Sequence, residues 1–249
     1  ANAISELLES CDRVIVMGHK LPDFDAFGAS IALARVAKNM GKEAFVAVDK
    51  QRNLARALID HISDKAMIES LISPAEAVEL VNDKTLLFIV DTHNPDFVEN
   101  KKLYTECEKV VVIDHHRKMV SYIDDAVIFY HEPYASSASE MVAELIQYIG
   151  SRGKITKTEA ELLLAGIMLD TKNFIINSGS RTFEAASTQT KVGQTTTSHL
   201  ASFTKGLIAL ISSTACEGVL FIFQLPAIIG LRILLFSLLI IKCCYTGKL

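Results

Sequence analysis

The sequence predicts an α/β fold, with a mostly parallel sheet and helices on both of its faces, and three observations support this prediction. Short apolar segments alternate with stretches of helical periodicity along most of the first 190 residues. The predicted strands are apolar throughout, which is typical of strands buried on both faces of a parallel sheet. The first two strands are joined through a predicted helix, as in a βαβ unit.

The βαβ unit opens the chain. Residues 13–18 (RVIVMG) form a short apolar run that ends at glycine, which predicts a buried strand. In the following helix, apolar residues recur at helical spacing at Ile31, Ala34, Val36, Ala37 and Met40. Gly41 is expected to end this helix at the C′ position. Residues 43–48 then form the second predicted strand.

The alternation continues through the next hundred residues. Helices are predicted near residues 53–61 and 74–82, and strands at residues 86–90 and 110–113. Two capping boxes mark later helices. Ser137 and Glu140 begin a helix that runs to about residue 149, and Thr156 and Glu159 begin one that runs to about residue 169.

Charge is distributed unevenly along the 249 residues, of which 50% are hydrophobic and 22% charged, with a mean hydropathy of +0.29. Residues 1–191 contain 28 acidic and 21 basic side chains, a net charge of −7. Residues 192–249 contain only five charged side chains, with a net charge of +3. The acidic part has no basic stripe for nucleic acid, so we expect no duplex nucleic-acid partner. Five cysteines without a C-x-x-C pair favour a reducing compartment.

Acidic and histidine side chains follow three of the predicted strands: His19, Asp23, Asp25, Asp91, Asp114, His115 and His116. In a parallel α/β sheet, ligands bind beyond the carboxyl ends of the strands. An aspartate at a strand end more often caps a helix or closes a turn, so the prediction depends on the coincidence of these residues with histidines at one edge. This arrangement indicates a metal site. His93 and His131 are interpreted instead as surface or hydrogen-bonded core residues.

The spacing of the acids favours two metal ions. Pro22 restricts the loop, and an extended backbone would point Asp23 and Asp25 to opposite sides. Asp91 is then placed to bridge two ions. Oxygen and imidazole ligands without thiolate favour Mn²⁺, Mg²⁺ or Fe²⁺ over structural zinc. Two such ions, about 3.5–4 Å apart, could activate a water and neutralise charge at a phosphoryl centre.

The sequence resembles the DHH phosphoesterases in four motifs that occur in the expected order. They are HKLPDFDA at residues 19–26, Asp91, the run Asp114-His115-His116, and Asp170. The group includes RecJ-type exonucleases, family II pyrophosphatases, nano-RNA and pAp phosphatases, and GdpP-type cyclic-di-AMP phosphodiesterases. The extended segments most resemble the GdpP type: GHKLPDFDAFGAS, VDTHNP, VIDHHRK, PYASSASEMVAEL and LAGIMLDTKNF.

The resemblance implies two Mn²⁺ sites that share Asp91, with Mg²⁺ or Fe²⁺ as alternatives. The first site is expected to consist of His19, Asp23 and Asp91. The second is expected to consist of Asp25, Asp91, His115 and Asp170. Asp170 lies in an apolar helical segment, where a buried acid would otherwise be costly.

The resemblance also implies roles beside the metals. His116 is expected near the substrate phosphate, and Asp114 is expected to orient the histidines. Arg181, in SGSRTF, is a candidate phosphate ligand, with a surface role as an equal alternative. Ser137 could contact phosphate at a helix N-terminus, although helix capping is the favoured role.

The implied reaction is attack of a metal-bound hydroxide on one 3′–5′ phosphodiester of cyclic di-AMP, which yields linear pApA. The chain has neither a G-x-S-x-G elbow nor a Walker loop, and this reaction needs no protein nucleophile. One alternative within the family is a nano-RNA or pAp phosphatase, which would act on short oligonucleotides or pAp. Another is a non-catalytic nucleotide-binding domain, which the filled ligand positions disfavour.

The resemblance ends near residue 187, which divides the chain into a DHH catalytic domain, residues 1–187, and an apolar tail, residues 188–249. A DHHA1 domain with a G-G-G-H type motif would be expected here, and its absence would impair activity. Residues 219–241 could form a membrane segment or part of an unusual second lobe. A shifted reading frame is the favoured interpretation, because the composition changes abruptly after RTFEAAS.

The GdpP type also carries expectations about the parent protein. It implies a larger protein anchored in the cell membrane, with the DHH domain on the cytoplasmic face. Contact between the tail and the membrane, and a homodimer, are left open.

Overall fold

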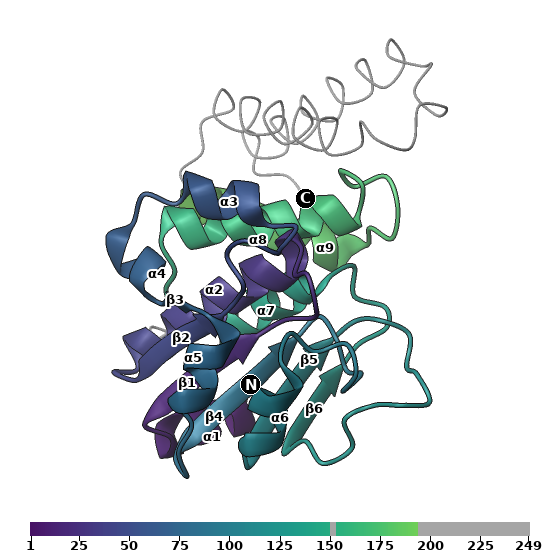
Figure 1. Ribbon diagram of the computed structural model, residues 1–249. Helices are drawn as coiled ribbons and strands as arrows, with labels where there is room; N and C mark the ends of the chain where they lie inside the picture. The colour runs from purple at the N-terminus through teal and green to yellow at the C-terminus, as the bar shows by residue number, and fades with distance from the viewer. Residues whose placement is uncertain (150–152, 194–249) are drawn as a thin grey trace. The chain divides into compact units, whose positions relative to one another are not determined.

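The computed structural model describes residues 1–149 and 153–193, in which six strands form one sheet (Figure 1). The strands are β1 (Arg13–Met17), β2 (Glu43–Ala47), β3 (Leu71–Ile72), β4 (Thr85–Val90), β5 (Lys109–Asp114) and β6 (Ile128–His131). Their order across the sheet is β3-β2-β1-β4-β5-β6, and every neighbouring pair is parallel. The predicted α/β fold with a mostly parallel sheet is confirmed.

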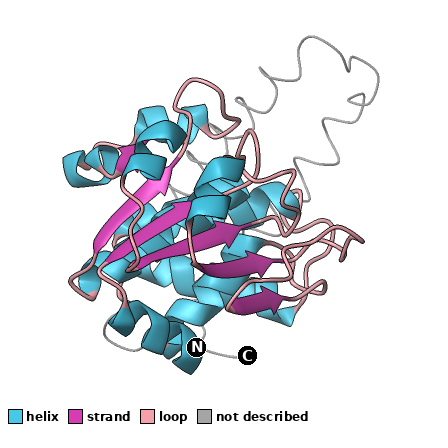
Figure 2. Cartoon of the chain, turned by 60° about the horizontal axis from the view of Figure 1, so that its bottom comes forward, coloured by secondary structure: helices cyan, strands magenta, loops and turns pink. Residues whose placement is uncertain are grey.

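Helices lie on both faces of the sheet (Figure 2). They are α1 (Asn2–Ser10), α2 (Phe24–Asn39), α3 (Arg56–His61), α4 (Lys65–Glu69), α5 (Pro74–Glu79), α6 (Lys101–Glu106), α7 (Ala138–Tyr148), α8 (Lys157–Asp170) and α9 (Ser180–Gly193). On one face, α2 packs against β1 and β2, and α7 packs against β5. Helix α8 covers α2 on the side away from the sheet and also contacts α7 and α9.

Helices cover both faces of the sheet, and the side chains of each strand alternate between these two buried faces. In β1, Ile15 and Met17 belong to a core cluster that includes Ala77 of α5 and Leu103 of α6. The intervening valines are equally buried and point to the opposite face, where α2 lies. This two-sided burial is the physical reason for the apolar strand sequences.

The four predicted strands are confirmed as β1, β2, β4 and β5, with each boundary within one residue of its expected position. The edge strands β3 and β6 were not predicted. Strand β3 has only two residues, and every residue of β6 is half-buried, so neither has a strong apolar pattern.

Two helices are shorter than predicted because nearby backbone groups bond elsewhere. Helix α3 begins at Arg56, since the N–H groups of Leu54 and Ala55 donate to the carbonyl of Pro22. Helix α5 ends at Glu79, and Asn82 closes the turn that leads into β4.

The two predicted capping boxes differ in detail. The Thr156 box is present, and the carboxylate of Glu159 accepts the Thr156 N–H at 2.7 Å. At α7 only half of the box forms: the Ser137 hydroxyl accepts the Glu140 N–H at 2.9 Å. The Glu140 carboxylate instead accepts bonds from the N–H and hydroxyl of Ser136, one residue earlier. Gly41 has a φ of 76° after α2, as predicted for a helix stop.

Glycines allow α8 to approach its neighbours closely. A Cβ atom at Gly166 would lie 2.3 Å from Ser139 Oγ and 2.9 Å from Asp25 Oδ1. A Cβ atom at Gly28 of α2 would lie 2.5 Å from the carbonyl oxygen of Leu162. These contacts leave no room for a side chain, and they bring the carboxyl end of α8, with Asp170, towards the ends of the strands.

Most of the tail, including the segment at residues 219–241, lies outside the described residues. Helix α9 extends from the predicted catalytic domain past residue 187 to Gly193. Within residues 1–149 and 153–193, we found no helix that is both long and apolar enough to span a bilayer.

Candidate metal centre

The candidate site lies where the strand order reverses, between β1 and β4. Loops that leave two such strands diverge towards opposite faces, which opens a crevice at the carboxyl edge of the sheet. His19 follows β1, Asp91 follows β4, and His115 and His116 follow β5. The structure therefore brings together the residues that were predicted from three separate strand ends.

The first cluster consists of His19, Asp23 and Asp91. His19 Nε2 lies 3.4 Å from Asp91 Oδ2 and 3.8 Å from Asp23 Oδ1. His19 Nδ1 lies 2.8 Å from the Lys20 carbonyl oxygen, which can only accept, so Nδ1 carries a hydrogen and Nε2 faces the carboxylates. Asp23 also caps α2, where its Oδ1 accepts the N–H groups of Asp25 and Ala26.

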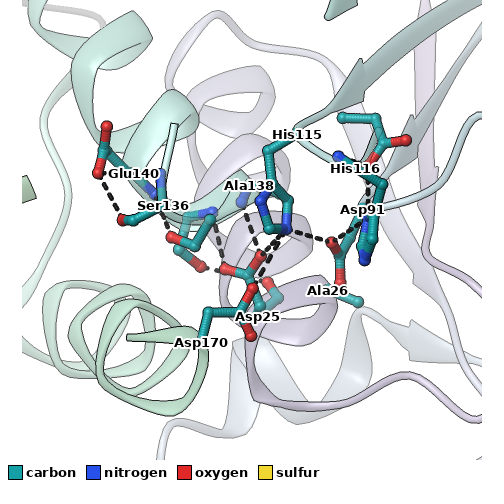
Figure 3. Close-up of polar contacts among 12 residues, drawn as sticks. Asp25, Ala26, Asp91, His115, His116, Ser136, Ala138, Glu140 and Asp170 are labelled. Atoms are coloured by element: carbon teal, nitrogen blue, oxygen red, sulfur yellow. Dashed lines mark hydrogen bonds and ion pairs between the residues drawn. The ribbon is translucent and has the colours of Figure 1, made fainter. Parts of the chain in front are cut away.

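The second cluster is centred on His115 (Figure 3). Its Nε2 lies 3.1 Å from Asp170 Oδ2, 3.2 Å from Asp91 Oδ1 and 3.8 Å from Asp25 Oδ2. Asp170 is the last residue of α8, and the short α8 contact at Gly166 accounts for its approach. Asp91 thus contributes one oxygen to each cluster.

The donor atoms fit a divalent cation. Three overlapping groups each have one ligand atom per residue within 4.8 Å of the others: His19, Asp23 and Asp91; Asp25, His115 and Asp170; and Asp91, His115 and His116. Asp91 Oδ1 and His115 Nε2 are buried and 3.2 Å apart, yet no contact of either atom within the described residues has the geometry of a hydrogen bond. Buried polar atoms rarely lack partners, and a cation would satisfy both of these. Carboxylate oxygens and imidazole nitrogens are suitable donors for Mn²⁺ and related ions.

The electrostatics of the site also favour bound positive charge. Burial, together with the charges of Asp91 and Asp170, raises the pKa of Asp25. Burial alone would lower the pKa of His115, but its interactions with Asp170 and Asp91 raise that pKa to about 11. His19 behaves in the same way beside Asp23 and Asp91, and its pKa is also about 11. Without a cation, protons on the two imidazoles balance the negative charge of the carboxylates. A bound cation would supply that positive charge instead.

Asp25 is held by the N-terminus of α7, a contact that the sequence analysis missed. The N–H of Ala138 donates to Asp25 Oδ2 at 2.6 Å, and the N–H of Ser139 donates to Oδ1 at 2.8 Å. A helix N-terminus stabilises the negative charge of this fully buried carboxylate. The Ser137 and Glu140 pattern marks where α7 begins, but it carries no information about which distant carboxylate its amides would meet.

Asp91 adopts a left-handed backbone conformation, with a φ of 60°, directly after β4. This conformation is uncommon for residues other than glycine and clusters at functional sites. The Asp91 N–H still donates to the Ile113 carbonyl oxygen at 2.9 Å, so the ladder between β4 and β5 is continued as the chain turns.

Behind the metal cluster, Asp114 joins two histidines. Its Oδ1 accepts from the N–H of His116 at 3.2 Å and from His116 Nδ1 at 2.9 Å, while its Oδ2 bonds to His93 Nδ1. Burial would raise the pKa of Asp114, but the bonds from His116 and His93 lower it to about 2. His93 is 1% exposed, consistent with its interpretation as a hydrogen-bonded core residue. His131 donates from Nε2 to the His116 carbonyl at 2.6 Å.

The two predicted substrate ligands have structural partners of their own. Ser137 is fully buried, and its hydroxyl caps α7. Arg181 is partly exposed and pairs with Glu144 of α7. Their contact with a substrate stays a prediction.

A sequence profile described as "DHH family, N-terminal domain" matches residues 13–167. The chain belongs to the DHH family. This confirms the resemblance drawn from the four motifs, and it accounts for the grouping of acids and histidines along one sheet edge.

Two relatives of this DHH chain are cyclic-di-AMP phosphodiesterases by name. GdpP of Geobacillus thermodenitrificans is 44% identical over 190 residues, which cover 75% of this chain and 29% of that protein. PdeA of Listeria monocytogenes is 40% identical over 199 residues, which cover 79% of this chain and 30% of that protein. The DHH chain therefore spans less than a third of the length of these relatives.

Among solved structures, the DHH chain is similar to an exopolyphosphatase-related protein from Bacteroides fragilis. The TM-score is 0.67 at 20% sequence identity, and the alignment covers 87% of this chain and 61% of that one. At this identity the likeness shows a common fold, and it agrees with the parallel sheet described above.

Proposed function

We propose that this DHH domain is a metal-dependent phosphodiesterase that opens cyclic di-AMP to linear pApA. The observation that carries the proposal is Asp91, a buried carboxylate whose two oxygens face His19 on one side and His115 on the other. The names of the GdpP and PdeA relatives support the choice of a cyclic dinucleotide as substrate.

The residues of the two clusters would hold two divalent cations, with Mn²⁺ as the proposed ion and Mg²⁺ or Fe²⁺ as alternatives. His19, Asp23 and Asp91 would hold one ion. Asp25, Asp91, His115 and Asp170 would hold the other. When bound, such ions supply Lewis-acid polarisation of the phosphodiester and activation of water.

The protein's own groups would hold the metal ligands in place and orient the substrate phosphate. The α7 amides hold Asp25 in one orientation, and the Lys20 carbonyl holds the His19 ring. The His116 side chain is 56% exposed and anchored through Nδ1 by Asp114, which leaves its other ring nitrogen for a substrate phosphate. Arg181 would reach a phosphate only by exchanging its bond to Glu144, and Ser137 is proposed mainly as a cap.

The test is hydrolysis of cyclic di-AMP, pApA and pAp by the full chain, with Mn²⁺, with Mg²⁺ and after chelation, with products separated by chromatography. We expect metal-dependent appearance of pApA from cyclic di-AMP. Turnover of pAp without ring opening would instead assign the domain to the nano-RNA or pAp phosphatases. Binding of cyclic di-AMP without hydrolysis of any substrate would support a non-catalytic nucleotide-binding domain.

We also propose that residues 1–187 are the catalytic domain of a larger membrane-anchored protein, with the site on the cytoplasmic face. The small share of the relatives' length that this chain covers supports this proposal. Fractionation of cells that express the natural gene product should find it in the membrane pellet. Sequencing the coding DNA beyond codon 187 should recover a DHHA1-like sequence in another frame if the tail arises from a frameshift.

A further inference from the structure

His93 lies behind the metal site and bonds to the protein through three groups. Its Nδ1 bonds to Asp114 Oδ2, its Nε2 accepts the N–H of Met119 at 2.9 Å, and its carbonyl accepts the N–H of Ile123 at 2.8 Å. The side chain is 1% exposed, and the Phe129 ring packs edge-on against it at a centroid distance of 6.1 Å. His93 is therefore fixed on all sides.

These bonds determine which ring nitrogen carries the hydrogen. The Met119 N–H can only donate, so His93 Nε2 must be the acceptor. The hydrogen therefore resides on Nδ1, which donates it to Asp114. A backbone amide thus sets the tautomer of His93 from the far side of the ring.

The constraint passes through Asp114 to His116. With Asp114 Oδ2 held by His93, Oδ1 is left to accept from the backbone N–H and the ring Nδ1 of His116. His116 must therefore also carry a hydrogen on Nδ1. The His116 side chain is 56% exposed, so the bonds to Asp114 are what hold its ring in place.

We propose that His93 is a positioning residue, which fixes the carboxylate of Asp114 and through it the orientation of the His116 ring. This inference rests on the proposed phosphodiesterase function only for its kinetic consequence. The same ring also accepts the N–H of Met119. It therefore links Met119, which follows the Asp114-His115-His116 run, to Asp114, the acid that orients His116. Buried partners of this kind keep a functional imidazole in one geometry.

Two substitutions of His93 each remove one hydrogen bond of the ring and keep the other. In His93→Asn, the amide nitrogen lies near the position of Nδ1, so the donor to Asp114 is kept while the acceptor for Met119 is lost. In His93→Gln, the amide lies near the position of Nε2, so the acceptor for Met119 can be kept while the donor to Asp114 is lost. Phe129→Leu is the packing control, since it changes a neighbour of the ring and neither of its hydrogen bonds.

The first readout is the imidazole ¹⁵N spectrum of the full chain without metal, which needs no activity. We expect Nδ1 of both His93 and His116 to carry a hydrogen in the natural chain. The His116 Nδ1 resonance should keep its shift in His93→Asn and Phe129→Leu, and should move in His93→Gln, because the unanchored Asp114 carboxylate no longer fixes that hydrogen bond. An unchanged His116 Nδ1 resonance in His93→Gln, with circular dichroism showing a folded protein, would overturn the proposal.

The second readout is the kinetics of cyclic di-AMP hydrolysis by the metal-loaded chain. We expect His93→Gln to lose about 10–100-fold in kcat with little change in KM, and His93→Asn to recover most of that loss. Equal losses in His93→Gln and Phe129→Leu would assign the effect to packing and contradict the proposal. If the natural chain hydrolyses none of the substrates, the proposed function fails, whereas the ¹⁵N spectra still decide the role of His93.

Discussion

Asp91 is the residue on which the site depends most. It is 3% exposed, its backbone turns sharply after β4, and its two oxygens belong to different clusters. Like charges on Asp25 and Asp170 surround it, so a neutral side chain at this position would remove the shared ligand while leaving the other acids in place.

We predict that Asp91→Asn lowers kcat/KM by about 100-fold or more, because electrostatic stabilisation at both clusters is lost together. Asp96→Asn is the matched control, since this acid lies in the same loop but is exposed, and within residues 1–149 and 153–193 it pairs with Lys101 at 2.7 Å. The control should keep normal activity and metal binding. Activity that survives Asp91→Asn would rule out a two-metal site.

Metal binding should release protons, because His19 and His115 both have a pKa of about 11 without metal. A cation needs the Nε2 lone pairs of both rings, and burial also raises the pKa of the ligands Asp25 and Asp170, so loading at pH 8 should release at least about two protons per chain. The metal affinity should therefore rise as the pH rises towards the pKa of the two histidines. Calorimetry in two buffers with different ionisation enthalpies measures the number of protons released. Binding heats that do not depend on the buffer would contradict the predicted proton release.

At the residue scale, the strand ends were enough to predict most of the site from the sequence. His19, Asp91 and His115 follow apolar strands whose carboxyl ends must meet in a parallel sheet. Asp170 was predicted only from the family resemblance. It ends α8, and its position near the other acids depends on the close packing of α8 against α7 and α2 at Gly166. The amide bonds to Asp25 could not be predicted, since they join its side-chain carboxylate to backbone N–H groups more than a hundred residues away.

At the scale of elements, the packing of α8 against α2 and α7 decides where Asp170 lies. Gly166 is the point of closest approach, and the atoms that a side chain there would meet belong to Ser139 and Asp25. A larger residue would therefore disturb a metal ligand and the helix that supports it at the same time.

We predict that Gly166→Ala destabilises the fold by about 1–3 kcal/mol through overpacking. It should also weaken metal affinity by about 10–100-fold through displaced ligands. Gly179→Ala is the control, because a Cβ atom there would meet nothing within 4 Å. Urea unfolding and metal titration measure the two effects, and a Gly166→Ala chain as stable and as tightly metal-binding as the control would refute the prediction.

The same scale shows where sequence patterns stop being informative. The central strands β1, β2, β4 and β5 were predicted because burial on both faces forces an apolar sequence. The edge strands β3 and β6 were missed because one side of each lacks a neighbouring strand, and their composition is correspondingly mixed. The length of α3 was overestimated because the N–H groups of Leu54 and Ala55 donate to the Pro22 carbonyl instead of joining the first turn of the helix.

At the scale of the whole molecule, the site draws on four segments of the chain, three of them ends of strands that pair in one sheet and the fourth the end of α8. The proposed ligands come from the loops after β1, β4 and β5 and from the end of α8. A cation that binds only the folded chain must therefore stabilise the entire domain.

We predict that Mn²⁺ at about 100 times its dissociation constant stabilises the chain by about 2.7 kcal/mol per site. Differential scanning calorimetry should show a higher Tm with Mn²⁺ and a return to the lower value after chelation. Asp91→Asn should abolish the shift, whereas Asp96→Asn should keep it. A Tm that does not respond to the metal in the natural chain would contradict the prediction.

The position of Asp170 at the end of α8 also sets an order of assembly during synthesis. His19, Asp23 and Asp91 leave the ribosome long before Asp170, so the ligands of the first cluster are present while the second still lacks one of its acids. The second cluster becomes complete only when α8 has docked on α2 and α7. Under the proposed two-metal site, a nascent or truncated chain that ends before this helix would offer only one of the two metal positions in full, and binding of a second ion would report that the domain has finished folding.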